Sequence, residues 1–313
     1  MQLLLRLALA VAVSTGLYTA GLCFPPVATP LLLFVPMPGL VLATHAPSRE
    51  CALWFALTAS LTMALLGAPA TVGFLLPLGA PTLVLAVGIR SFWSFERLVI
   101  AGVGAWAAAV TGLSLLAYGD VTALIAAARE QLLNSYNLAL STSGSIGAPD
   151  STLVAMEAER DVLIDGLLQI LPALVILTGA LTVITNLVLL RNWMGIARNV
   201  NLRLWRAPDV LIWALIVTGF CIFMPVPPVA LMARNVFLVL LGCYFCQGLA
   251  IVSYYLERFR LPRGIRVASY ALIAVQHVVT AMVLALGVFD LWGNFRRLGT
   301  TGPANVPLDT EGE

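Results

Sequence analysis

The residue types best suited to chemistry lie together in the stretch GCYFCQG, residues 242–248. Cys243 and Cys246 have the Cys-x-x-Cys spacing of redox-active pairs. They lack an adjacent helix start, a nearby proline and a second cysteine pair, and thiols buried in an apolar helix are poor nucleophiles. The surroundings of the two cysteines therefore favour small packing residues over a redox site. The neighbouring Gln247 becomes the residue of interest.

Gln247 lies inside an apolar run over residues 235–256. At a rise of about 1.5 Å per residue it is about 15 Å from Arg258, beyond the end of the run, and so near the middle of a bilayer. A glutamine at this depth either hydrogen-bonds across a helix interface or lines a substrate cavity. Gly242 and Cys246 share a neighbouring face of this helix and predict a close contact with a second helix.

Four other polar residues within apolar runs are candidate cavity or interhelix contacts: Asn186, Asn235, Gln276 and His277. The last two fall in the middle of one predicted span, residues 267–288, where His277 is either a neutral hydrogen-bonded residue or part of a proton relay. A relay requires an acidic partner, and the long spans contain no Asp or Glu, which disfavours an ion-coupled pump. With two histidines in the chain, we expect neither a metal site nor a cofactor.

The composition predicts that these residues belong to a membrane protein. Of 313 residues, 60% are hydrophobic and 10% are charged, whereas a soluble fold needs a larger polar surface. We expect an all-α polytopic transmembrane bundle over residues 1–298 with about nine helices, in a range of eight to ten. The predicted spans are 3–24, 26–45, 51–67, 69–89, 98–118, 167–190, 209–224, 235–256 and 267–288.

Prolines interrupt two of these spans: Pro30, Pro36 and Pro38 in the second, and Pro69, Pro77 and Pro81 in the fourth. Irregular backbone at membrane depth is tolerated where protein covers it or where it lines a cavity. The prolines are therefore consistent with a binding cavity and with kinked packing.

The arginines predict the orientation. If nine helices alternate, 12 of the 17 arginines fall on one side, which the positive-inside rule makes the cytoplasmic side. This places the N-terminus in the cytoplasm of a bacterial cell with the chain in its inner membrane, and the C-terminus outside. Arg296 and Arg297 fit this arrangement least well.

Residues 119–166 form a polar insert with a net charge of −5. Val121, Ile125 and Leu132 recur at helical spacing, the turn-rich residues 141–151 follow, and a second helix is expected from about residue 151. We expect a helical hairpin on the outer face, either a solvated loop or a partner-binding surface. The tail, residues 299–313, has little to bury and is expected to be disordered.

No enzyme motif occurs in the sequence. The chain contains no Gly-x-Ser-x-Gly, no His-Glu-x-x-His and no phosphate-binding loop. We expect the protein not to be an enzyme and not to bind nucleic acid.

Three stretches of the C-terminal third resemble the YybS-like family of bacterial multi-pass membrane proteins of unknown function: LRLWRAPDVLIWALI, ARNVFLVLLGCYFCQGLAIVSYYLERFRLP and GVFDLWGNFRRL. The matching positions are Trp205, Pro208, Asp209, Asn235, Gln247, Gly248, Tyr255, Gly287, Asp290, Phe295 and Arg296. Structurally, Asp209 suits the start of a helix, and Asp290 with Arg296 suits a turn pair beyond the last span.

That family is distantly similar to the substrate-binding subunits of energy-coupling-factor transporters, which dock a partner through small residues four apart on the first helix. Ala8, Ala12 and Gly16 have this spacing. The resemblance implies a small-molecule-binding or transport component in the lipid bilayer, with a membrane-protein partner on that face. The alternative is an envelope scaffold or interaction protein without transport activity.

Overall fold

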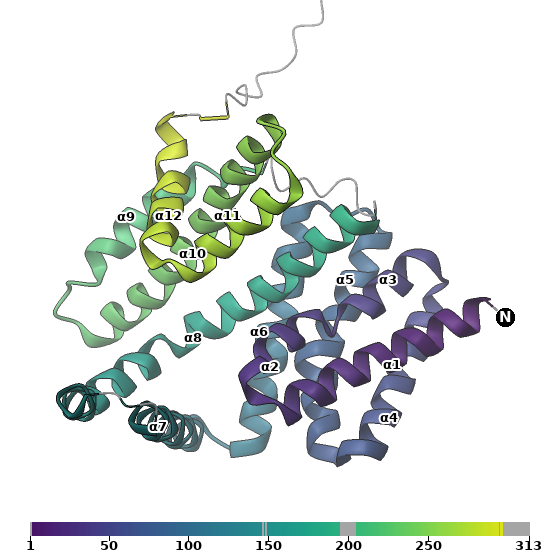
Figure 1. Cartoon of the computed structure of the whole chain (residues 1–313), viewed down its shortest axis with the longest axis horizontal. Helices are drawn as coiled ribbons and strands as arrows, with labels where there is room; N and C mark the ends of the chain where they lie inside the picture. Colours follow the sequence, from purple (N-terminus) through teal and green to yellow (C-terminus); the bar gives the residue numbers. More distant parts are fainter. Residues whose placement is uncertain (1, 146, 148, 195–204, 294, 297–313) are drawn as a thin grey trace, which may run out of the picture. The chain divides into compact units, whose positions relative to one another are not determined.

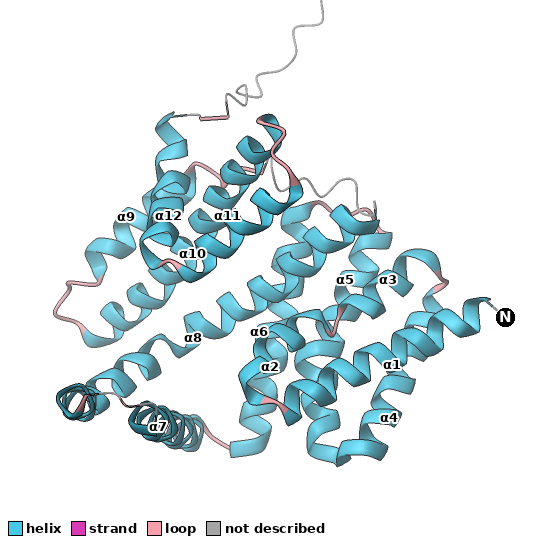
Figure 2. Ribbon diagram, in the orientation of Figure 1, coloured by secondary structure: helices cyan, strands magenta, loops and turns pink. Residues whose placement is uncertain are grey.

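A computed structural model describes residues 2–145, 147, 149–194, 205–293 and 295–296. Regular structure in these residues is helical, and they contain no strand, which confirms the all-α class (Figure 2). The chain divides into two compact units, called unit 1 (Met1–Asn201 and Val217–Val239) and unit 2 (Leu202–Ile216 and Leu240–Glu313). The tail predicted to be disordered lies outside the described residues.

The helices of unit 1 are α1 (Gln2–Cys23), α2 (Pro25–Phe34), α3 (Met37–His45), α4 (Ser48–Phe74), the π-helix η1 (Leu75–Gly79), α5 (Ala80–Arg90), α6 (Phe95–Tyr118), α7 (Val121–Ser145) and α8 (Asp150–Met194) (Figure 1). Both units share α9 (Val210–Cys221) and α10 (Pro227–Arg258), and unit 2 is completed by α11 (Arg263–Val275) and α12 (His277–Gly293).

The helix α4 reverses direction at Gly67, whose φ of 81° and ψ of −179° are not helical. Glycine adopts this conformation without the steric cost that a Cβ would add. The residues on either side form an antiparallel pair, because Gly79 packs directly on the ring of Phe55 and the hydroxyl of Thr71 lies 3.7 Å from the sulfur of Met63. The two arms correspond to the predicted spans 51–67 and 69–89.

Prolines mark the irregular segments of unit 1, as predicted. The second predicted span is broken at Val35 and Pro36 between α2 and α3, and Pro77 lies within η1. A π-helix widens the backbone by one residue per turn and often occurs at functional sites. These two irregular segments therefore mark where unit 1 departs from simple helix packing.

The core of unit 1 forms between α1 and α4. The rings of Tyr18 and Trp54 both meet Phe74 edge-on, with centroids 5.6 and 6.2 Å away. The buried hydroxyl of Ser14 donates to the carbonyl of Val35 over 3.1 Å. This bond satisfies one of the carbonyls freed where α2 ends.

The predicted insert is a helical hairpin of α7 and the first part of α8. Arg129 and Asp165 pair at 2.5 Å, and the hydroxyl of Tyr136 donates to the carbonyl of Met156. Asp120 directly precedes α7, where its carboxylate accepts hydrogen bonds from the N–H of Ala123 and the hydroxyl of Thr122. These bonds hold the pKa of Asp120 below its usual value. That the hairpin lies on the outer face stays a prediction.

Five helical stretches of the described residues are long and apolar enough to cross a membrane, or six if the bent pair α11 and α12 forms one span: Leu4–Cys23, Arg49–Arg90, Phe95–Tyr118, Ser151–Arg191 and Pro227–Arg258. Arg49–Arg90 contains both arms of the turn at Gly67. The predicted spans 26–45 and 209–224 are represented by the shorter apolar helices Pro30–His45 and Val210–Cys221.

The prediction of one continuous helix over residues 267–288 is wrong. The chain bends by 100° between α11 and α12, and Gln276 at the break has an extended backbone with φ −98° and ψ 105°. The hydroxyl of Thr280 donates to the carbonyls of Ile273 and Gln276 there. Hydropathy alone missed this break, because the apolar residues on both sides of Gln276 and His277 keep the average hydropathy high across it.

Candidate functional site

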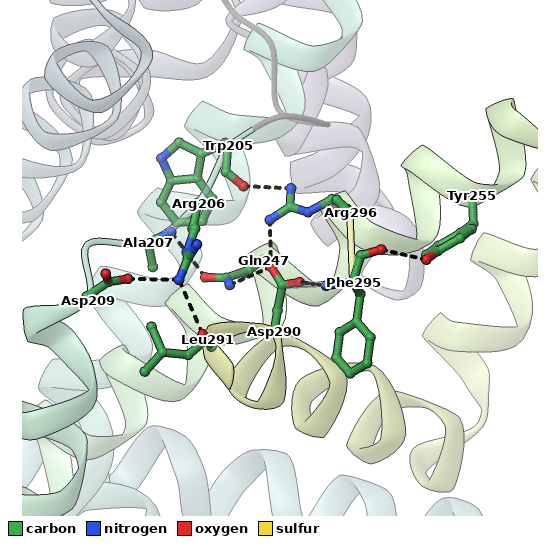
Figure 3. Close-up of polar contacts among 10 residues, drawn as sticks. All are labelled: Trp205, Arg206, Ala207, Asp209, Gln247, Tyr255, Asp290, Leu291, Phe295 and Arg296. Carbon is green, nitrogen blue, oxygen red and sulfur yellow. Dashed lines mark hydrogen bonds and ion pairs between the residues drawn. The ribbon is translucent and has the colours of Figure 1, made fainter. Parts of the chain in front are cut away.

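Gln247 connects three segments of unit 2 (Figure 3). It lies on α10 and is 1% exposed. Its side-chain oxygen accepts the backbone N–H of Ala207 at 3.1 Å, and its side-chain nitrogen donates to the carboxylate of Asp290 on α12 at 3.1 Å. Both ends of the amide therefore bind protein groups, as the interhelix alternative expects.

Asp290 and Arg296 form a buried ion pair at 2.8 Å, with side chains 3% and 0% exposed. The other carboxylate oxygen of Asp290 accepts the backbone N–H of Phe295 at 3.0 Å, and Arg296 also donates to the carbonyl of Trp205 at 2.9 Å. The predicted pairing is thus present. Asp290 lies in the last turn of α12 and not beyond the helix, since α12 continues to Gly293.

The other residues of the resemblance surround this pair. Asp209 directly precedes α9 and pairs with Arg206 at 3.1 Å, and Arg206 also donates to the carbonyl of Leu291. The hydroxyl of Tyr255 donates to the carbonyl of Phe295 at 2.7 Å, while Pro208 is exposed. We call Gln247, Asp290 and Arg296, with the backbone groups they bind, the polar clasp.

Two glycines allow α10 and α12 to approach closely at the clasp. A Cβ on Gly248 would overlap the carbonyl of Val283, and one on Gly287 would overlap the carbonyl of Tyr244. The close contact predicted at Gly242 and Cys246 is therefore centred at Gly248 instead. The cysteines are partly buried and unbonded, in keeping with packing residues.

Asn235 supplies hydrogen bonds to the backbone of α8 beside Pro172, in unit 1. Pro172 lies inside α8, and a regular helix would join the N–H of Ala173 to the carbonyl of Gln169. The Asn235 amide lies between these groups, since its oxygen accepts from Ala173 at 2.9 Å and its nitrogen donates to Gln169 at 2.8 Å. This candidate cavity residue therefore has a structural role.

Replacing Asn235 by leucine is expected to lower stability by about 1–3 kcal/mol, because the N–H of Ala173 then has no partner at the proline break. Thermal unfolding in detergent measures the loss. Replacing Pro172 by alanine in the same variant should recover most of it, because a regular helical bond can then form. Equal losses with and without Pro172 would show that Asn235 does not stabilise the protein through its hydrogen bonds at the proline.

Gln276 and His277 lie apart from the clasp. Both are exposed at the start of α12, whereas Asp290 lies 13 residues further along that helix, a rise of about 20 Å. The structure thus brings Gln247 together with Asp290 and not with His277.

A small cavity in unit 1 is lined by the irregular segments. Its walls include Pro36 between α2 and α3, Pro77 of η1, and Trp106 and Asn186 from α6 and α8. It has room for about one water molecule. The prolines therefore coincide with both features expected of them, an irregular backbone and a cavity.

Two residues that line this cavity each have a buried polar atom without a hydrogen-bond partner. Asn186 is 0% exposed, and its amide nitrogen donates to the carbonyls of Leu33 and Thr182, both at 2.8 Å, whereas its oxygen has no donor. The indole N–H of Trp106 has no acceptor. A buried polar atom without a partner is costly, and each of these two atoms is a candidate contact for a molecule in the cavity.

Residues 12–291 match the family described as predicted membrane protein (DUF2232). The chain belongs to this family. No curated protein and no solved structure matches the chain. The family description agrees with the apolar helices, and the DUF2232 chain is a membrane protein of an uncharacterised family. This agrees with the resemblance in its class of protein, a multi-pass membrane protein of unknown function.

Sequence reasoning missed Trp106 and the role of Pro172 in the DUF2232 chain. A tryptophan in an apolar helix gives no signal that its N–H lacks an acceptor. Thr182 and Asn186 share one face of α8 at a spacing of four residues, which was the available sign of a polar stripe.

Proposed function

We propose that this DUF2232 protein binds a small neutral molecule in the membrane, as a capture or transport component without catalytic activity. The observation that supports it is the cavity of unit 1, with an unpartnered acceptor on Asn186 and an unpartnered donor on Trp106. A neutral amide or heterocycle edge offers the complementary groups, and the apolar proline walls disfavour a charged ligand. The proposed setting is a bacterial inner membrane with a cytoplasmic N-terminus.

A ligand larger than water requires the wall of the cavity to move. The wall includes the break at Pro36 and the π-helix η1 around Pro77, where the regular α-helical hydrogen-bond pattern is interrupted. Broken helices flank the binding sites of many transporters. These segments are the proposed moving parts.

The test is a thermal-shift screen of the detergent-solubilised chain with water-soluble vitamins and nucleobases. At a concentration about 100 times Kd, a bound compound adds about 2.7 kcal/mol to stability. Replacing Trp106 by phenylalanine should weaken a hit about 5-fold to 10-fold, because one hydrogen bond contributes about 1 kcal/mol.

Trp54→Phe is the matched control for that variant. The Trp54 indole N–H is also buried without a partner, but Trp54 does not line the cavity. Its replacement should leave affinity unchanged. Equal weakening by both variants, or a panel without any hit, would contradict the proposed function.

An interaction protein is the second candidate. Ala8, Ala12 and Gly16 are all exposed on α1, and a Cβ on Gly16 would meet nothing within 4 Å. A partner helix could therefore approach this face closely. Photo-crosslinking from position 12 in membranes would remove the main support for this candidate if it recovered no second protein.

A further inference from the structure

We propose that α11 and α12 form a re-entrant hairpin, which enters the membrane and leaves it on the same side. Both ends of the hairpin lie on the arginine-rich side, and its tip is at Gln276 and His277. The C-terminal tail then lies on that side and not on the opposite one, as alternation of nine spans predicts. This inference does not depend on the proposed ligand.

The position of the chain after α12 supports this arrangement. The carbonyl of Phe295 accepts a hydrogen bond from Tyr255, in the last turn of α10, and Arg296 binds the carbonyl of Trp205, just before α9. A span that began after α10 and crossed the bilayer would leave Phe295 about 30 Å from Tyr255. The hydrogen bond of 2.7 Å places it at the same end instead.

The lengths and directions of the two helices agree with a hairpin. With 13 and 17 residues, α11 and α12 rise about 20 and 25 Å, which is less than the hydrocarbon thickness of about 30 Å. The bend of 100° turns the second helix back, and Figure 1 shows the two helices meeting in a V.

The distribution of arginines agrees better with the positive-inside rule in this arrangement. Alternating spans placed Arg296 and Arg297 on the arginine-poor side, whereas the hairpin places both on the side of Arg258 and Arg263. The count on that side rises from 12 to 14 of the 17 arginines, as the positive-inside rule favours for one membrane face.

The tip has a physical consequence. Backbone that is not helical occurs at membrane depth only where protein or water covers it. Gln276 has such a backbone, and the side chains of Gln276 and His277 are exposed in the described structure. The hairpin thus places the polar groups of these two residues inside the membrane, where lipid alone offers them no hydrogen-bond partner.

The experiment places one protease-cleavage sequence in each of three full-length variants, after Gly147, after Arg260 or after Gly302. Each is tested in sealed right-side-out and inside-out membrane vesicles. The sites after Arg260 and Gly302 should be cut in the same preparation, and the site after Gly147 in the other. Cleavage after Gly302 together with Gly147, and not with Arg260, overturns the proposal.

A second measurement leaves the membrane domain without insertions. The full chain is fused at its C-terminus to alkaline phosphatase, which is active only outside the cytoplasm, or to a fluorescent protein that matures only inside it. The proposal expects an inactive phosphatase and a fluorescent fusion. An active phosphatase with a dark fluorescent fusion overturns it.

Discussion

Replacing Asp290 by alanine is expected to lower the stability of the protein by about 3–5 kcal/mol. The Arg296 side chain is 0% exposed and would lose its carboxylate partner at 2.8 Å. The buried guanidinium then keeps the neutral carbonyl of Trp205 but has no negative charge to stabilise it. The midpoint of thermal unfolding in detergent measures the loss.

Asp209→Ala is the matched control. Asp209 also pairs with an arginine, at 3.1 Å, but its side chain is 71% exposed. An exposed pair contributes about 0–1 kcal/mol, so this variant should unfold close to the wild type. If Asp290→Ala were no less stable than Asp209→Ala, the polar clasp would not stabilise unit 2.

A double variant separates the charge from the packing. Replacing Asp290 by leucine and Arg296 by methionine removes both charges while keeping apolar volume, and such exchanges are often neutral or stabilising. Some loss remains, because the N–H of Phe295 and the amide of Gln247 lose the carboxylate that they bind. The double variant should therefore be more stable than Asp290→Ala but less stable than the wild type.

The sequence predicted local features of the fold well. The predicted spans 51–67 and 69–89 correctly separated the two arms that meet at Gly67, and Val121, Ile125 and Leu132 correctly predicted α7. In each case the signal lies within a few residues of the feature. Long-range pairings leave no such signal, so the partners of Gln247 could not be derived.

The clasp shows why the site was only partly predictable. The depth of Gln247 in an apolar helix follows from the sequence, and burial makes a hydrogen-bond partner necessary. Asp290 and Arg296 are six residues apart, which is not a spacing that pairs side chains within one helix. They meet because the chain turns after Gly293 and because Trp205 supplies a carbonyl from a distant segment.

Asn235 shows the converse case. Its type and its place in an apolar run suggested a cavity, but its partners are backbone groups beside a proline 63 residues earlier. The sequence contains both residues without any sign that they meet. Side-chain amides therefore have different roles in unit 1, at Asn235, and in unit 2, at Gln247, and the difference depends on which groups around them need partners.

Replacing Gly287 by alanine is expected to lower stability by about 3 kcal/mol, because the added methyl group overlaps the backbone carbonyl of Tyr244. Backbone cannot move aside as a flexible side chain can, so α10 and α12 must separate. Gly112→Ala is the control, since a Cβ there meets nothing within 4 Å in the interior of α6. That change should be neutral or stabilise by about 0.5–1 kcal/mol. Equal unfolding temperatures for the two variants would contradict the close contact.

The same substitution links the glycine contact to the polar clasp. If α12 moves away from α10, the hydrogen bond of 3.1 Å between Gln247 and Asp290 lengthens as well. Gln247→Leu should then cost less stability in the Gly287→Ala background than in the wild type, since residues that share a contact are not additive. Additive losses would mean that the clasp holds α12 without the help of the glycines. A coupling of about 1 kcal/mol would instead show that the small residues set the distance at which Gln247 reaches its carboxylate.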